Sequence, residues 1–219
     1  MIYWERIPAL VAAICLSVYW FWVVVMLVRL SRKIGKDPNA MPRERVGQLM
    51  RVVWYPCILV LILGLWLTAS MSWRGFDAGD FKGFMHGWLW RPAAWWWFAA
   101  AGASGICVAF TVMTFVCWRR MGKSWRIGID PGETLVMVVS GPYQYVRHPI
   151  YALRMAINVC AFVMAPTMVV LIPAAVDFLL LQIEARREEK YMEATHGEAY
   201  REYKRRVGRF LPRMGAVGK

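Results

Sequence analysis

The stretch HPIYALRMAINVCAFVMAPTMVVLIPAAVDFLLLQI, residues 148–183, decides the fold. Only Arg154 and Asp177 are charged in it, and Pro166 lies near its middle. A single α-helix of this length would measure about 54 Å at about 1.5 Å per residue, whereas the hydrocarbon core of a bilayer is about 30 Å thick. We therefore predict two shorter membrane-spanning helices that turn back on each other as a hairpin at Pro166.

Three further uncharged runs precede this stretch, at residues 7–28, 52–73 and 92–118. Each is long enough to cross a bilayer as a helix. The first run is followed rather than preceded by basic residues and is too long for a signal peptide, so we expect it to be retained as a span. With 59% hydrophobic residues and a mean hydropathy of +0.39, the chain is predicted to be an all-α, polytopic membrane protein with about five transmembrane helices.

The formal net charge of +13 allows two interpretations, nucleic-acid binding or basic loops beside an anionic membrane surface. The basic residues flank the apolar runs and form no platform of stacked aromatic and basic side chains, which favours the membrane and excludes nucleic acid as a partner. Residues 29–51 carry seven Lys or Arg and two Asp or Glu, whereas residues 74–91 carry three and two. The positive-inside rule then predicts an N-terminus outside and a C-terminus in the cytoplasm. Within residues 29–51, the segment 44–51 is a candidate for a short interfacial helix.

Cysteine and histidine give no metal-binding pattern. The cysteines all lie in apolar runs without a Cys-x-x-Cys motif, and the histidines are far apart. These residues are Cys15, Cys57, Cys107, Cys117 and Cys160, and His86, His148 and His196. We expect the cysteines to be small buried hydrophobes and predict no metal site.

Residues 141–212 contain the side chains that apolar composition does not explain. Gly141-Pro142 is a turn signal, and Pro149 suits the first position of a helix. Arg147 and His148 would then stand at the N-terminus of the fourth span, where a helix end and a guanidinium favour an anion. The alternative is a basic pair that extends to the membrane surface.

Glu188 and Glu189 follow the fifth span beside Arg186 and Arg187, where they could simply form ordinary ion pairs on a solvated helix. An antiparallel hairpin, however, would bring them to the same end as Arg147-His148. A cationic and an anionic group close together suit a zwitterionic amino-acid group. Aromatic side chains at this end could line an adenine slot or contact a sulfonium, although an interfacial aromatic belt also accounts for some of them. They are Tyr143, Tyr145, Tyr151, Tyr191, Tyr200 and Tyr203.

The order of these motifs resembles the superfamily of isoprenylcysteine carboxyl methyltransferases and phospholipid methyltransferases. The motifs are Gly141-Pro-Tyr, Tyr145-Val-Arg-His-Pro-x-Tyr151, Glu188-Glu189, Gly197…Tyr200…Tyr203 and Phe210-Leu-Pro212. The resemblance covers roughly residues 122–212, whereas the first hundred residues show no matching motif. It implies an integral membrane enzyme that uses S-adenosylmethionine. It divides the chain into three N-terminal spans, residues 1–118, and a methyltransferase core, residues 119–219, made of a cytoplasmic loop, the hairpin 148–183 and a C-terminal helix.

The same resemblance implies roles for individual residues, although it does not divide cofactor binding from catalysis sharply. The positions matching catalytic or near-acceptor residues are Arg147, Tyr151 and Glu188. The positions matching cofactor-binding residues are Leu135, Val136, Gly141, Tyr143, Tyr145, His148, Pro149, Glu189 and Tyr200.

The methyl acceptor stays open, with a lipophilic carboxylate favoured over a phospholipid amine, a small thiol, or a quinol-type or fatty-acid oxygen. Arg154, Asn158 and Asp177 could line its route from the bilayer, because polar groups inside a membrane are costly unless they are used. Helix–helix hydrogen bonding explains these three residues about as well. Two other functions are also compatible with the motifs, an NADPH-dependent reductase of the sterol type and a non-catalytic membrane scaffold. The sequence does not predict an oligomeric state.

Overall fold

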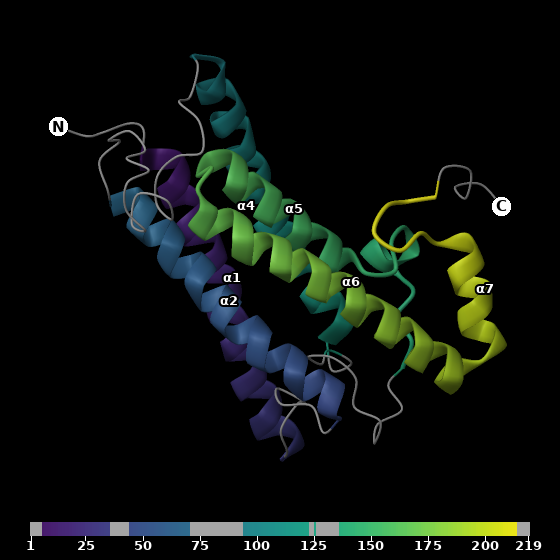
Figure 1. Cartoon of the computed structure of the whole chain (residues 1–219). Helices are drawn as coiled ribbons and strands as arrows, with labels where there is room; N and C mark the ends of the chain where they lie inside the picture. Colours follow the sequence, from purple (N-terminus) through teal and green to yellow (C-terminus); the bar gives the residue numbers. More distant parts are fainter. Residues whose placement is uncertain (1–5, 36–43, 71–93, 123–124, 126–135, 214–219) are drawn as a thin grey trace.

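A computed structural model describes residues 6–35, 44–70, 94–122, 125 and 136–213. Over these residues the chain is helical and contains no strand, which confirms the all-α prediction (Figure 1). The elements are α1 (Ile7–Ile34), α2 (Arg45–Ser70), α4 (Ala94–Met121), the 3₁₀ helix η3 (Gly141–Gln144), α5 (Pro149–Met164), α6 (Met168–His196) and α7 (Glu198–Arg206). The predicted loop 74–91 lies outside the described residues.

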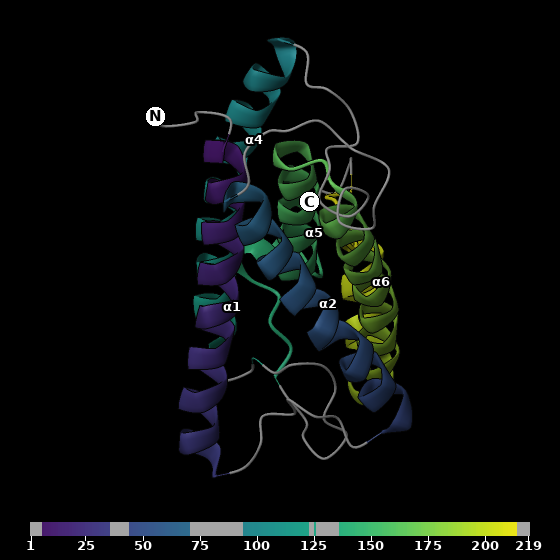
Figure 2. The same cartoon turned by 60° about the vertical axis from the view of Figure 1, so that its left-hand side comes forward.

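Four of these helices, α1, α2, α4 and α6, are long and apolar enough to cross a membrane. This confirms a multi-pass membrane protein. The fifth predicted span, α5, has 16 residues and is about 24 Å long, which is shorter than the hydrocarbon core. Figure 2 shows α5 beginning part-way along the bundle rather than at its end. The protein groups at the start of α5 therefore lie deeper than the ends of the longer helices.

The predicted hairpin turns where the sequence placed it. α5 ends at Met164, the chain turns through Ala165 and Pro166, and the amide N–H of Thr167 donates to the carbonyl of Ala165 at 2.8 Å. The second arm differs from the prediction, because α6 does not stop near residue 183 but continues to His196. Its charged residues are good helix formers, and the helix ends only at Gly197, whose φ of 56° is unfavourable for other residues.

The segment 44–51 is not a separate interfacial helix. Residues from Arg45 onward form the first turns of α2. The helix passes through Gly47 without a break and contains no proline before Pro56. α2 packs along α6, and Gly64 makes a close approach possible, since a Cβ there would lie 2.8 Å from a methyl carbon of Val169. The close packing of α2 on α6 brings N-terminal residues beside the predicted core 119–219.

A buried polar cluster joins α2, α5 and α6 inside the bundle. Both carboxylate oxygens of Asp177 accept hydrogen bonds from Arg154, at 2.9 and 2.5 Å. Asp177 also accepts from Trp54 Nε1 at 2.5 Å and from Asn158 Nδ2 at 2.7 Å. The Arg154 guanidinium lies 4.4 Å from the ring centroid of Trp20 on α1. The structure thus brings together the three residues predicted for the acceptor route, and it gives Arg154 and Asp177 protein partners.

We expect Asp177→Asn to lower the free energy of unfolding by about 3–5 kcal/mol, because it leaves the Arg154 charge buried without a counter-charge. A double variant, Arg154→Met with Asp177→Leu, should recover most of that loss. Thermal denaturation of the purified protein in an uncharged detergent measures both. Full stability in Asp177→Asn would show that the ion pair does not hold the helices together.

Candidate functional site

Two segments far apart in the sequence pair at the start of α5. The amide N–H of Arg147 donates to the carbonyl of Gly208 at 2.8 Å, and that of His148 donates to the carbonyl of Arg209 at 3.0 Å. Gly208 is required here, because a Cβ at this position would lie 1.9 Å from the carbonyl oxygen of Leu211. The Gly-Arg-Phe-Leu-Pro end of the motif therefore folds back against the segment before α5.

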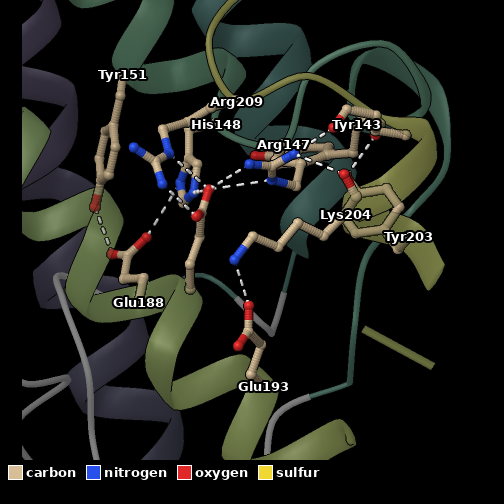
Figure 3. Close-up of polar contacts among 11 residues, drawn as sticks. Tyr143, Arg147, His148, Tyr151, Glu188, Glu193, Tyr203, Lys204 and Arg209 are labelled. Atoms are coloured by element: carbon tan, nitrogen blue, oxygen red, sulfur yellow. Dashed lines mark hydrogen bonds and ion pairs between the residues drawn. The ribbon is translucent and has the colours of Figure 1, made fainter. Parts of the chain in front are cut away.

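Pro149 occupies the first turn of α5 and His148 precedes it as the N-cap residue, as predicted. Upstream, Gly141 has a φ of +66° and begins η3, which carries the buried Tyr143. This local geometry turns Arg147 and His148 toward α6. Figure 3 shows both side chains and Arg209 directed at one region, with Tyr151 and Glu188 beside it.

Glu189 is the centre of this cluster. Its Oε1 accepts hydrogen bonds from Arg147 Nη2 at 2.8 Å and Nε at 3.1 Å. Arg209 donates to the same carboxylate through Nε at 2.9 Å and Nη2 at 2.6 Å. His148 Nε2 lies 3.3 Å from Oε1 at ion-pair distance. One buried carboxylate thus holds three cationic groups from two segments against α6.

The sequence predicted a cationic group at Arg147-His148 and an anionic group at Glu188-Glu189. The structure brings these groups together, but Arg147 and Glu189 pair with each other. Besides Glu189, Arg147 Nη1 donates to the carbonyl of Lys204 at 3.2 Å and to that of Val207. The Arg147 guanidinium thus donates hydrogen bonds to three protein groups, and Glu189 accepts hydrogen bonds from two arginines. Charge-assisted, bidentate pairs of this kind are among the strongest polar contacts in proteins. Arg147 and Glu189 hold the site together, and their predicted contact with a ligand stays a prediction.

Glu188 is the more accessible carboxylate. Its Oε1 accepts a hydrogen bond from the hydroxyl of Tyr151 at 2.5 Å, and its Oε2 lies 3.4 Å from His148 Nδ1. Its side chain is 24% exposed, compared with 3% for Glu189. The rings of His148 and Tyr151 stack at 5.5 Å and fix both partners of Glu188. Glu188 can therefore accept a further hydrogen bond.

His148 is poised between its two carboxylates. Burial of the imidazole opposes its charged form, but Glu188 and Glu189 outweigh this effect and raise the pKa of His148 above its usual value. The imidazolium is thus stabilised by the cluster. The ring of Phe210 lies tilted against the imidazole, with the two ring centroids 6.0 Å apart.

Three of the predicted tyrosines, Tyr143, Tyr200 and Tyr203, lie close to one another beside the cluster. Tyr203 donates its hydroxyl to the carbonyl of Tyr143 at 2.6 Å, and the buried ring of Tyr200 lies 5.9 Å from that of Tyr203. The hydroxyl of Tyr143 itself is buried and has no hydrogen-bond partner within the described part of the chain. Burial, together with the nearby Cys117 and Glu188, raises the pKa of Tyr143 well above its usual value.

Two predicted cofactor residues, Tyr145 and Val136, do not join this cluster. Tyr145 is half exposed, with 49% of its surface accessible, and Val136 is 78% exposed. Leu135 lies outside the described residues. Arg209 and Phe210 belong to the cluster although the sequence assigned them no role. Both residues follow Gly208 directly in the same motif. Their place beside this glycine is the feature of the sequence that could have indicated a role for them.

Comparison with known proteins finds similarity to membrane methyltransferases in part of the chain. Residues 103–194 match the model of the isoprenylcysteine carboxyl methyltransferase (ICMT) family. A methanethiol S-methyltransferase of Crocosphaera subtropica is 39% identical over 75 residues, which are 33% of this chain and 28% of that relative. The aligned part therefore spans less than a third of the relative's length.

We expect Glu189→Gln to lower the free energy of unfolding by about 3 kcal/mol or more, because Arg147 would keep its buried charge without a carboxylate. The matched control is Glu193→Gln. Glu193 accepts a hydrogen bond from Lys204 at 2.5 Å, but both side chains are about one-third exposed or more, so its loss should cost less than about 1 kcal/mol. Equal denaturation midpoints for the two variants would contradict a central role for Glu189.

The raised pKa of His148 predicts a stability that depends on pH. The imidazolium is bound more strongly in the folded protein, so its contribution is fully present below about pH 6.5, the unfolded value, and is lost as pH rises through the folded pKa. The gap in melting temperature between the wild type and His148→Gln should therefore narrow as pH rises above about 6.5. Melting curves for both proteins below and above this pH measure it, and a constant gap would argue against the assignment.

Proposed function

From the match of residues 103–194 to the ICMT family we propose that the protein is a membrane methyltransferase. Its methyl donor is S-adenosylmethionine, and its acceptor is a lipophilic molecule that reaches the site from the bilayer. One observation carries the proposal. The motifs at residues 146–148, 188–189 and 207–210, which composition does not explain, assemble into one polar cluster at the start of α5.

The unsatisfied groups of the cluster fit the amino-acid end of the proposed donor. Glu188 is partly exposed and can accept from an ammonium. Tyr143 offers a buried hydroxyl that lacks a partner among the described residues, and it lies within electrostatic range of Glu188. A buried hydroxyl of this kind is costly unless a ligand satisfies it, so it can donate to a carboxylate. These residues supply one acceptor and one donor on either side of the cluster, as a zwitterion requires (Figure 3).

The chemistry asked of the protein is mainly alignment. A bound sulfonium supplies an electrophilic methyl group, and the transfer is an in-line displacement that gains from fixed geometry and exclusion of water. Glu189 holds Arg147, Arg209 and His148 in place, while stacking on Tyr151 orients His148. The catalytic assignments of Arg147, Tyr151 and Glu188 are part of this proposal, with Arg147 as a positioning residue and Tyr151-Glu188 nearest the reacting groups.

We favour a carboxylate as the acceptor, because the matching family is one of carboxyl methyltransferases. Similarity to a methanethiol S-methyltransferase makes a thiol the second candidate. Within the predicted acceptor route, Asn158 Oδ1 is buried without a hydrogen-bond partner in the described structure, whereas Asp177 accepts several hydrogen bonds. We therefore assign Asn158 to the route and regard Arg154 and Asp177 as its supports.

The orientation with the N-terminus outside and the C-terminus in the cytoplasm is part of the same proposal. The end of α1 and the beginning of α2 lie at the lower end of the bundle in Figure 2. Basic residues lie at or toward this end, with Arg32 and Lys33 in the last turn of α1 and Arg119 and Arg120 in the last turn of α4. A cytoplasmic donor would enter from this side.

The first test is binding of labelled S-adenosylmethionine to the detergent-purified protein. We expect saturable binding that Glu188→Gln weakens about tenfold or more, because one charge-assisted contact to the ammonium is lost. Glu193→Gln, an acidic residue one and a half turns further along α6, should leave the affinity unchanged. Binding of NADPH instead would support the reductase, and binding of neither would support the scaffold.

A further inference from the structure

Arg51 on α2 is a buried cation whose hydrogen bonds are incomplete. The residue is 2% exposed, and its Nε and Nη2 have no hydrogen-bond partner in the part of the chain that the structure covers. A guanidinium stays protonated in proteins and can only donate. Burying such donors unpaired costs free energy, so a buried arginine in this state indicates a missing acceptor.

The nearest carboxylate compensates Arg51 only in part. Glu184 Oε1 lies 3.6 Å from Arg51 Nη2, beyond a hydrogen bond. The other oxygen of Glu184 accepts a hydrogen bond from Arg187 Nη1 at 2.5 Å, and Arg187 also pairs with Glu44. Glu184 is thus directed at Arg187 and shares its charge between two guanidinium groups. Arg51 therefore keeps capacity for another anion.

The surroundings of Arg51 connect it to the proposed active site. Its guanidinium lies 4.8 Å from the ring centroid of Trp54, which keeps its plane in place. Arg51 and Glu184 both lie within electrostatic range of Tyr151, whose hydroxyl binds Glu188. Glu184, 3.6 Å from Arg51 Nη2, precedes Glu188 by one turn on the same face of α6, so an anion at Arg51 would lie on the side of α6 that leads to Glu188 and Tyr151.

The position along α2 suits the headgroup of an amphiphile. Arg51 lies within the second turn of α2, near the end of the bundle where α1 finishes with Arg32 and Lys33. Arg51 points into the bundle, whereas the outer face of the same turns carries exposed apolar residues, as at Leu49, Val52 and Val53. This part of α2 therefore presents an outer face suited to acyl or prenyl chains while its inner face carries a cation.

We propose that Arg51 binds the acidic headgroup of a membrane-soluble molecule between α2 and α6, and that this molecule is the methyl acceptor. The inference rests on the proposed methyltransferase function and adds to it a residue outside the part that matches the ICMT family. Arg51 is a positioning residue whose N–H groups donate to a lipid oxyanion, a carboxylate or a phosphate. An uncharged thiol offers these donors a much poorer acceptor.

The test is binding of amphiphiles to the full chain in dodecyl maltoside micelles, measured by calorimetry. The probes are oleate, dioleoyl phosphatidate, oleyl amine and octadecanethiol. We expect oleate, phosphatidate or both to bind, and Arg51→Gln to weaken that binding about tenfold or more. The control Arg119→Gln, an exposed arginine at the same end of the bundle, should leave it unchanged. Binding of oleate alone assigns a carboxylate, and binding of phosphatidate alone assigns a phosphate.

Variants of Glu184 distinguish binding of a ligand by Arg51 from simple charge compensation between Arg51 and Glu184. Glu184→Gln should strengthen binding of the acid, since a competing carboxylate is removed. The double variant Arg51→Gln, Glu184→Gln should regain stability lost in Arg51→Gln but not its affinity. Restored affinity in the double variant, no binding of either acid by the wild type, or equal binding of the amine or thiol would overturn the proposal. Binding of S-adenosylmethionine, measured on the same samples, fails only if the proposed function itself is wrong.

Discussion

The carboxylate of Glu189 is the constraint on which the site depends. It lies on α6 and is almost fully buried, a position that is tolerable only with close, well-directed cations. Arg147 comes from the segment before α5 and Arg209 from the segment after α7, and both meet that one group. Because both guanidinium groups donate twice, the position of each segment is fixed in direction as well as distance. The backbone pairing between these segments and the stacking of His148 follow from that arrangement.

Much of the fold was predictable because it depends on properties of single segments. Uncharged length, the proline at the hairpin turn and Pro149 at the start of α5 each act locally, and the structure agrees with all three. The predicted helix bounds were wrong at the start of α2 and at the end of α6, where the end of a helix depends on its neighbours. Both segments carry charged residues, which in the sequence indicated a solvent-exposed segment outside the span. Ion pairs such as Arg51 with Glu184 allow these charges to be part of long, packed helices.

The sequence predicted which residues belong to the candidate site better than it predicted which of them pair with each other. The motif order pointed to His148, Glu188 and Glu189, and the hairpin brought them together. The sequence could not show that Arg147 and Glu189 satisfy each other, because this depends on side-chain geometry between distant segments. It also gave no sign of Arg51, which stands in an unremarkable basic loop pattern and becomes distinctive only through its burial. Residues outside any recognised motif can therefore complete a site that the motif begins.

The pairing of residues 146–148 with 207–210 also makes the site depend on the last described segment of the chain. Gly208 and Arg209 follow α7, and Arg209 supplies one of the two guanidinium groups that neutralise the buried Glu189. Proteolysis between α7 and Gly208 would leave every apolar helix uncut and still remove this partner of Glu189. The protein can therefore lose its assembled cluster without losing a single membrane-spanning segment.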